Sequence, residues 1–264
     1  MALRLGLGLG LAGGAPFSPS SLYGSAGGDY WDFSDTSTLF QDTAATSPVT
    51  TAAQTIARVN GKLGRHNLTQ GTAGQRPAWA ALPNSKMAAQ FDGTDDGLSV
   101  AGFDMTGSDE ITYIIGLRKA SDAAVGMALE ASAAAASNNG TFSLLAPSSP
   151  TTDRYAMVSR GNATASAAVN GSSYDAPQTI VIGMKAKIST DTLEMYVNGA
   201  LSNQVTTDQG TGNYGNHTLY IGRRAGTSFP FNGFITSLII VGRNLSASEL
   251  VKANAWVNAR TGAY

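Results

Sequence analysis

The segment 192–259 constrains the fold more than any other part of this sequence. Residues 193–197 alternate between apolar and polar side chains, as a half-buried strand does, and the dipeptide Asn198–Gly199 that follows suits a tight β-hairpin. The run 234–241 is apolar on both faces, which predicts a strand covered on both sides. Residues 246–262 combine capping-box spacing, helical apolar periodicity and a glycine near the end. We therefore predict a hairpin, a buried strand and a closing C-terminal helix.

Shorter strand-like segments recur from Met87 onward. The clearest is 180–188, in which apolar residues alternate with two lysines on the solvent side. Asn60–Gly61 and Asn170–Gly171 are further hairpin signals. Glycine supplies 31 of 264 residues and charged residues only 13%, a composition that favours many short strands, and strands do not alternate with helices. The predicted fold class is all-β: an antiparallel two-sheet sandwich with a short C-terminal helix and an extended N-terminal arm.

The N-terminal third differs from the rest of the chain. Its first residues carry leucines that project to one face of an extended arm, namely Leu3, Leu5, Leu7, Leu9 and Leu11. The arm could add a strand to a neighbouring subunit or to its own sheet; we favour the neighbour, because exposed leucines on a free arm would promote aggregation. We predict three parts: an arm and linker (1–28), an irregular assembly segment packed on the main domain or a neighbour (29–80), and the sandwich (81–264).

Charge and composition limit the partners that this chain can have. A formal charge of −1 provides no basic field for phosphates, which argues against nucleic acid as a partner. The chain has no cysteine, which excludes disulfides and thiolate metal sites. No apolar run approaches the roughly twenty residues of a membrane-spanning helix, so we expect no membrane insertion.

Several short motifs occur in an order that resembles a known family. They are Phe91–Asp92–Gly93–Thr94–Asp95–Asp96, Tyr196–Val197–Asn198–Gly199, Tyr220–Ile221–Gly222, Phe231–Asn232–Gly233–Phe234–Ile235 and the helix from Leu245–Ser246 to Leu250. From about Met87 to Ala259 this succession resembles the laminin-G-like branch of the concanavalin A-like lectin/glucanase superfamily, which implies a jelly-roll sandwich. The lead-in from Trp31 to Asp42, with Pro48–Val49 and Gly74–Gln75–Arg76–Pro77, is similar to that of laminin-G-like proteins of tailed bacteriophages.

The acidic residues do not predict catalysis. Hydrolases of the family that the chain resembles carry a Glu-x-Asp-x-x-Glu type run on one strand, and glycoside hydrolysis needs two carboxyl groups that flank the bond. Here Asp109 and Glu110 are adjacent, and Glu194 lies alone between apolar residues. His66 and His217 lack the sequence context of a catalytic triad or a zinc site. We predict that the protein is not an enzyme.

One loop is the candidate ligand site. It and its surroundings contain an aromatic residue and several polar ones, namely Asn213, Tyr214, Asn216, His217 and Arg223. An aromatic face can stack on the C–H surface of a sugar while convergent polar groups bind its hydroxyls. The alternative is a glycine- and asparagine-rich hairpin loop whose tyrosine packs on its own neighbours. The sequence leaves both interpretations open.

Three aspartates form a candidate metal site. Asp92, Asp95 and Asp96 offer the oxygen ligands that calcium prefers, and laminin-G-like domains often bind calcium. The commoner use of such residues is a turn in which aspartate side chains accept from backbone amides. We favour the turn, and therefore predict no cofactor, with calcium as the alternative.

These observations and the resemblance predict a structural component of a phage or phage-like virion. On this prediction the protein is a homo-oligomeric tail or head-fibre (spike) subunit at the virion surface. Its sandwich binds host-surface glycans and its N-terminal arm contacts other virion proteins. The alternative is a purely architectural capsid decoration or tail adaptor protein without ligand binding.

Overall fold

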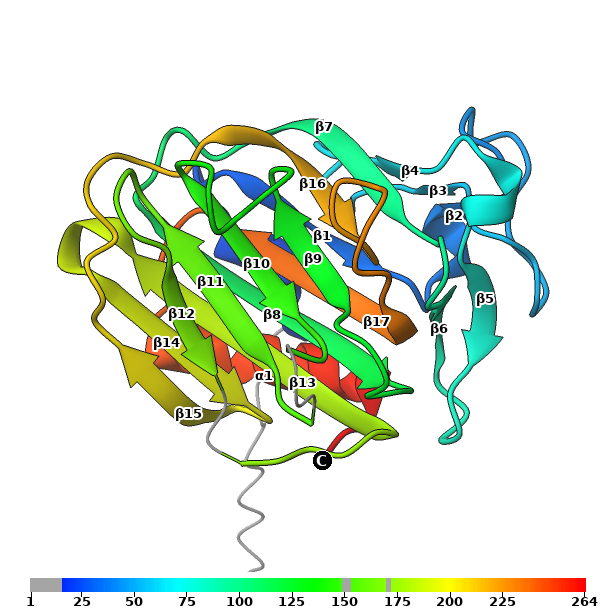
Figure 1. Cartoon of the computed structure of the whole chain (residues 1–264). Coiled ribbons are helices and arrows are strands. Elements are labelled where there is room, and N and C mark those ends of the chain that lie inside the picture. The colour runs from blue at the N-terminus through cyan, green and yellow to red at the C-terminus, as the bar shows by residue number, and fades with distance from the viewer. Residues whose placement is uncertain (1–15, 149–152, 170–171) are drawn as a thin grey trace, which may run out of the picture.

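The protein is a sandwich of two antiparallel sheets with one helix outside it. This computed structural model describes residues 16–148, 153–169 and 172–264 (Figure 1). The first sheet has the order β15 (Ala200–Val205), β14 (Thr192–Val197), β13 (Gln178–Lys187), β8 (Glu110–Lys119), β17 (Asn232–Val241), β6 (Met87–Asp92) and β5 (Ala78–Ala81), with β1 (Gly28–Asp32) also paired to β17. The second has the order β12 (Ser166–Val169), β11 (Ala156–Arg160), β10 (Thr141–Leu145), β9 (Met127–Ala131), β16 (Asn216–Ile221), β7 (Leu98–Asp104), β4 (Leu68–Thr69), β3 (Arg58–Val59) and β2 (Leu39–Phe40). The predicted fold class is confirmed.

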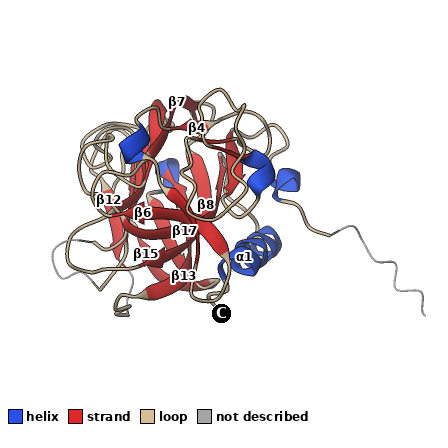
Figure 2. Cartoon of the chain, turned by 90° about the vertical axis from the view of Figure 1, so that its right-hand side faces the viewer, coloured by secondary structure: helices blue, strands red, loops and turns tan. Residues whose placement is uncertain are grey.

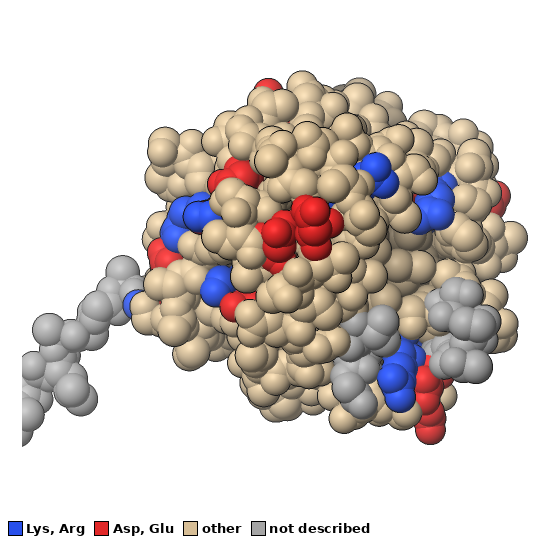
Figure 3. Space-filling model, turned by 60° about the vertical axis from the view of Figure 1, so that its left-hand side comes forward, with Lys and Arg blue, Asp and Glu red and all other residues tan. Residues whose placement is uncertain are grey.

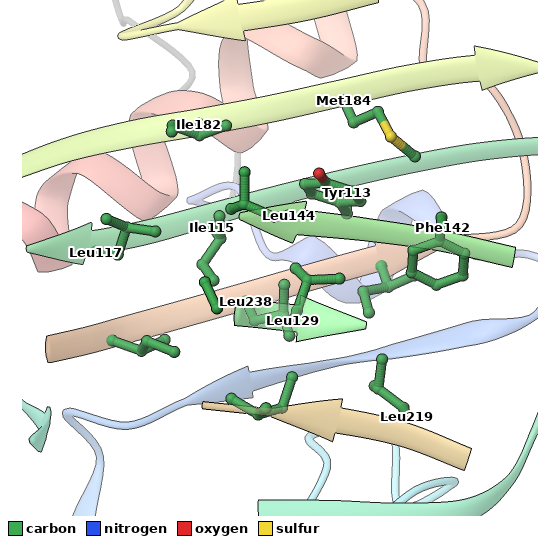
Figure 4. Close-up of a cluster of buried hydrophobic side chains, with 14 of the residues drawn as sticks. Tyr113, Ile115, Leu117, Leu129, Phe142, Leu144, Ile182, Met184, Leu219 and Leu238 are labelled. Carbon is green, nitrogen blue, oxygen red and sulfur yellow. The ribbon is translucent and has the colours of Figure 1, made fainter. Parts of the chain in front are cut away.

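The main core lies between the two sheets. Because side chains alternate across a strand, each sheet turns one row of apolar residues inward. Figure 4 shows side chains of both sheets meeting in this layer, among them Ile115 from β8, Phe142 from β10 and Met184 from β13, all at most 1% exposed. The hydroxyl of the buried Tyr113 donates to the carbonyl oxygen of Ser143 at 3.1 Å, so the polar end of this ring has a partner inside the core.

The C-terminal elements form as predicted. Asn198 and Gly199 join β14 to β15 and both have left-handed backbone angles, with φ of 49° and 81°. Strand β17 covers the apolar run and is buried from Ile235 to Val241. Helix α1 (Ala247–Thr261) begins with a complete capping box, in which the Ser246 side chain accepts from the Glu249 amide and the Glu249 side chain accepts from the Ser246 amide.

Helix α1 covers the outer face of the first sheet, against β8, β13 and β17 (Figure 2). A second apolar cluster fills this interface, with Ile114, Val181 and Ile239 from the sheet and Leu250, Ala253 and Val257 from the helix. Because helix and sheet both contribute buried residues here, the first sheet is covered on both faces, which explains why β8 and β17 read as continuous apolar runs.

Residues 29–80 join both sheets and are less irregular than we predicted. All five residues of β1 are buried beside β17, and Trp31 and Phe33 belong to the main core. Strands β2, β3 and β4 extend the second sheet, and the indole nitrogen of Trp31 donates to the carbonyl of His66 at 3.0 Å. The segment therefore packs on the sandwich in this structure. The division of the chain into three parts remains a prediction.

The residues just before β1 also lie on the sandwich. The guanidinium of Arg243 donates to the carbonyl of Leu22 at 3.0 and 2.7 Å, and Arg65 donates to the carbonyl of Ala26 at 2.8 Å. Leu22 and Tyr23 are buried in the cluster beneath the helix. The leucines at positions 3 to 11 lie outside the described residues, as does the signal Asn170–Gly171. Strand addition by the arm therefore stays a prediction.

Candidate functional site

Tyr214 is part of the core and is not displayed on a loop. Its side chain is 1% exposed, its ring lies edge-on to Phe142 with 5.9 Å between centroids, and its hydroxyl is 2.6 Å from the Ser159 hydroxyl. This burial raises the pKa of Tyr214 well above its usual value. A ring in this position offers no face to a sugar, so the ligand contact predicted for Tyr214 must be corrected. The alternative interpretation, packing on its own neighbours, describes its place.

The other predicted ligand residues do not form one site. The side-chain amide of Asn213 donates to the carbonyl of Thr106 at 2.6 Å, and His217 Nε2 lies 2.9 Å from the carbonyl oxygen of Asn139, so both tie loops to one another. Asn216 is exposed at the start of β16. Arg223 lies beyond the other end of that strand, is 6% exposed and donates to the Gln75 side chain at 2.7 Å.

The three aspartates come together in one turn. One carboxylate oxygen from each of them lies within 4.8 Å of the other two. The Asp92 side chain accepts from the amides of Thr94 (2.8 Å) and Asp95 (3.2 Å), and Asp96 accepts from the amide of Asp92 (3.0 Å). Burial, together with the negative charge of Asp92 and Asp95, raises the pKa of Asp96 to about 6. These oxygens are of the kind that calcium takes, and the bonds of Asp92 and Asp96 are of the kind that a turn makes, so the choice between the two interpretations stays a prediction.

A buried ion pair lies on the outer face of the second sheet. Glu130, the next-to-last residue of β9, points away from the core and is nevertheless 0% exposed. Arg224, on the loop that follows β16, donates to both of its carboxylate oxygens, with distances of 3.0 to 3.1 Å. The amide of Ala135, on the loop that follows β9, also donates to Glu130 at 2.8 Å. Two loops therefore close over the carboxylate and fix the guanidinium on the sheet.

Phe229 stands on the same loop as Arg224 and is partly open to solvent. The residue is 38% exposed, and the guanidinium carbon of Arg224 lies 4.8 Å from the centroid of its ring. The backbone of Phe229 is left-handed, with φ of 50°, a conformation that costs a bulky residue free energy. Its carbonyl accepts from the amide of Met127 at 2.8 Å, which holds the loop against the start of β9. The fold thus presents this ring at a local conformational cost.

Tyr220 completes the surface. It lies on β16, next to Glu130 of β9 on one side and Ser99 of β7 on the other, and turns away from the core because Leu219 and Ile221 turn inward. It is half-buried and lines a small hollow with neighbours that include Gln70, Ser99 and Gly226. We call Glu130, Tyr220, Arg224 and Phe229 the outer-face site. In Figure 1 the second sheet faces the viewer and the loop between β16 and β17 crosses in front of it.

The outer-face site combines two aromatic rings, a fixed guanidinium and neighbouring amide and hydroxyl groups. Aromatic faces and fixed donors of this kind suit a neutral, hydroxyl-rich ligand, since the charge of Arg224 is balanced by Glu130. The sequence offered one signal for it: Glu130 is the single charged residue in an otherwise apolar strand. The pairing with Arg224 joins residues 94 positions apart and has no local signature. Charged groups are few and scattered on the face that Figure 3 shows.

Comparison with known proteins gives the family. Residues 92–251 match the family described as the concanavalin A-like lectin/glucanases superfamily. Domain 4 of AbnA, an extracellular arabinanase from Geobacillus stearothermophilus solved with arabinotriose, is 16% identical with a TM-score of 0.58, and the alignment covers 87% of this chain and 98% of that domain. A Trypanosoma rangeli sialidase (13% identity, TM-score 0.54) aligns over 80% of this chain but only 34% of its own.

The binding domain of botulinum neurotoxin DC, solved with rat synaptotagmin II, is 12% identical with a TM-score of 0.51 and aligns over 78% of this chain and 52% of its own. No curated protein sequence matches the chain. At these identities the solved structures share the fold alone. The family match covers more than half of the sequence, and the chain therefore belongs to the concanavalin A-like lectin/glucanases superfamily.

Proposed function

We propose that this protein binds glycans through the outer-face site and performs no catalysis. The observation that carries the proposal is the presentation of Phe229: a partly exposed ring in a left-handed conformation, stacked on an arginine that a buried carboxylate holds in place. Strained, partly exposed aromatic residues on anchored loops are typical of binding sites. Membership of a lectin-containing superfamily and the fold shared with an arabinotriose-bound domain also support it.

The environment of Glu130 supports a non-catalytic role at this site. A glycosidase needs one carboxyl group that can donate a proton and a second that attacks or activates water. Both oxygens of Glu130 accept from Arg224, and one also accepts from the amide of Ala135, so this carboxylate serves as an anchor for the loops.

In the part of the chain that the structure describes, no helix is long and apolar enough to cross a membrane.

A glycan array tests the proposal. We expect the wild-type protein to bind a subset of glycans and Phe229→Ala to lose about tenfold or more in affinity for them. Leu201→Ala is the matched control, because Leu201 is also an exposed apolar residue (54%) but lies on β15 of the other sheet. Silence of the wild-type protein across the array, or equal loss in both variants, would refute glycan binding at this site.

We further propose that the protein works at the surface of a phage or phage-like virion, as a tail or head-fibre subunit. The support is the similarity of the lead-in 31–42 to that of laminin-G-like proteins of tailed phages. Incorporation into particles through residues 1–11 is part of this proposal, and a protein lacking them should fail to assemble. Normal incorporation of the truncated protein would contradict the role of the arm.

A purely architectural decoration or adaptor protein is the second candidate. The observation that favours it is the burial of Tyr214, which removes the aromatic residue of the loop predicted to bind. This candidate predicts normal assembly together with silence on the glycan array. Both candidates predict normal assembly of the full-length protein, so the glycan array is the measurement that separates them.

A further inference from the structure

The loop that carries Arg224 and Phe229 is also bonded to the N-terminal part of the chain. Arg223 directly precedes Arg224 in this loop and is 6% exposed. Its guanidinium donates from Nη2 to Oε1 of Gln75 at 2.7 Å. Among the described residues, Gln75 is the one hydrogen-bond partner of this guanidinium, and the buried Nε atom has none. A buried cation with a single acceptor depends strongly on that acceptor.

Gln75 is itself fixed on the sandwich by backbone bonds. It ends the short 3-10 helix η3 (Ala73–Gln75), and its carbonyl accepts from the amide of Gly97, just before β7, at 3.0 Å. The guanidinium of the next residue, Arg76, donates to three backbone carbonyls within residues 41–71 at 2.9 to 3.1 Å. Gln75 therefore offers its side-chain oxygen to Arg223 from a fixed place.

The same N-terminal segment lines the small hollow beside Tyr220. Gln70 and Arg223 are both part of the wall of this hollow. The side-chain amide of Gln70 donates to the carbonyl of Gly97 at 3.0 Å. A Cβ at Gly97 would lie only 3.1 Å from Cγ and Nε of Arg223, so the arginine packs closely on the turn before β7. The N-terminal segment and Arg223 therefore meet directly beside the outer-face site.

The loop is closed by bonds within its own backbone. The amides of Thr227 and Ser228 donate to the carbonyl of Arg224 at 2.9 and 3.1 Å, and the amide of Arg224 donates to the carbonyl of Ser228 at 2.8 Å. Phe229 follows directly, so this closed turn presents its ring. Arg223 lies at the start of the turn, and a change in its position would be transmitted to both binding residues.

We infer that Gln75 is a positioning residue of the outer-face site. By holding Arg223 it fixes the start of the loop, so that Arg224 reaches Glu130 and Phe229 keeps its exposed position. A residue that supports binding residues in this way raises affinity by keeping the site in its binding conformation. The effect on affinity rests on the proposed glycan binding, whereas the effect on the loop does not.

Gln75→Leu is the test variant, because leucine has a similar size but offers no acceptor to Arg223. We expect the amides of Arg224, Thr227 and Ser228 to exchange with solvent about tenfold or more faster in this variant, because a buried charged group loses its acceptor. The amides of the core strand β8 should exchange as in the wild type. Gln75→Glu should keep the slow exchange of the loop, because a carboxylate also accepts from a guanidinium.

Two further variants show whether the effect is specific. Gln41→Leu is the matched control: Gln41 is also a half-buried glutamine of the N-terminal segment, and its side chain makes one bond, to the carbonyl of Pro48 at 3.0 Å. It should leave exchange in the loop unchanged. Arg223→Met removes the donor, so Gln75→Leu should have no further effect in that background. If Arg223→Met does not fold, the comparison of Gln75→Leu with Gln75→Glu decides the question.

The experiment is amide hydrogen exchange of the full chain, followed by NMR, together with titration of the glycan that binds best on the array. We expect Gln75→Leu to weaken glycan binding about threefold to tenfold, and Gln75→Glu and Gln41→Leu to retain it. Wild-type exchange of the loop in Gln75→Leu, equally fast exchange in Gln41→Leu or Gln75→Glu, or a further effect in the Arg223→Met background would overturn the inference. A protein that binds no glycan would refute the proposed function, and the exchange rates would still decide whether Gln75 positions the loop.

Discussion

Phe229 links backbone strain to the proposed binding surface. Its φ of 50° places an aromatic residue where glycine is favoured, and the residue is 38% exposed. Its carbonyl bond to Met127 and its contact with Arg224 hold the residue in place. If this conformation is strained, glycine at position 229 should give a more stable protein than another residue that also lacks the ring.

Two substitutions measure that strain. Phe229→Ala and Phe229→Gly remove the same ring contacts, but only glycine relieves the left-handed conformation, so the glycine variant should be more stable by about 1 kcal/mol. At Leu201, in strand β15, the order should reverse, with alanine the more stable by about 0.5–1 kcal/mol. Urea unfolding of the four variants provides the comparison, and the same order at both positions would argue against strain at Phe229.

The pair formed by Glu130 and Arg224 should respond asymmetrically to loss of either partner. Glu130 is fully buried, whereas the Arg224 side chain is 24% exposed and can turn to water. Arg224→Met leaves a buried carboxylate without its cation and should cost about 3 kcal/mol, whereas Glu130→Gln should cost about 1 kcal/mol. Free energies of unfolding at neutral pH check this order. Equal costs would indicate that Glu130 gains access to water when Arg224 is removed.

Local chemistry predicts some residues well and others not at all. Asn198–Gly199 makes the hairpin that its sequence indicates, because its flanking strands pair directly. Asn60–Gly61 carries the same signal but opens the loop 60–67. There the buried carboxylate of Asp29 accepts from the amides of Leu63, Arg65 and His66, at 2.9 to 3.1 Å. This bonding comes from a residue more than thirty positions away, which turn statistics do not include.

At the scale of elements, helix α1 and β8 pack at a very short distance. A Cβ at Gly116 of β8 would lie 1.9 Å from the hydroxyl oxygen of Thr261 and 2.5 Å from that of Thr236. These two hydroxyls are 2.7 Å apart, and the hydroxyl of Thr236 also donates to the carbonyl of Gly116 at 3.1 Å. Glycine at this position thus allows the helix to meet the sheet.

Gly116→Ala should therefore destabilise the protein by about 1–3 kcal/mol through overpacking of the helix against the sheet. Gly183→Ala on the adjacent strand β13 is the control, because its nearest neighbour would be Tyr196 Cβ at an ordinary 3.4 Å. We expect the control to change stability by less than about 0.5 kcal/mol. Thermal unfolding of both variants decides the matter, and a harmless Gly116→Ala would show that the helix can move away.

The start of α1 predicts a dependence of stability on acid. The guanidinium of Arg243 and the bonds of the capping box lower the pKa of Glu249 from 4.5 to about 2. A lowered pKa means that this contribution is present above pH 4.5 and is lost as the pH falls toward 2. Because the side chain is about a third exposed, we expect a loss of only about 1 kcal/mol. Unfolding free energies between pH 5 and pH 2 should fall less steeply in Glu249→Gln than in the wild type.

Helix α1 and the sheet beneath it show which features of the fold can be predicted from hydrophobic periodicity. The capping box, the apolar spacing and Gly262 predict α1 to within a residue or two, because all three are local. Strands β8 and β17 are apolar on both faces, which predicts that their sheet is covered on its outer face, as it is by the helix. The insertion of β1 beside β17 could not be predicted, since it pairs residues 28–32 with 237–241 and the pairing partners share no local pattern.

On the scale of the whole molecule, residues 29–80 are continuous with the sandwich. They supply β1 and β5 to one sheet and β2, β3 and β4 to the other, with Trp31 and Phe33 in the shared core. The family match covers residues 92–251, so the strands that residues 29–80 add to both sheets lie outside the matched range. The sequence indicated the fold class through recurrent short strands, whereas the outer-face site depends on how two distant loops close over β9.

The most direct test of glycan binding is residue mapping by NMR. The glycan that binds best on the array would be titrated into isotope-labelled protein. We expect the largest backbone amide shifts at Tyr220 and at residues 222–229. Shifts confined to the loop 208–217, or no shift at saturating glycan, would contradict glycan binding at the outer-face site.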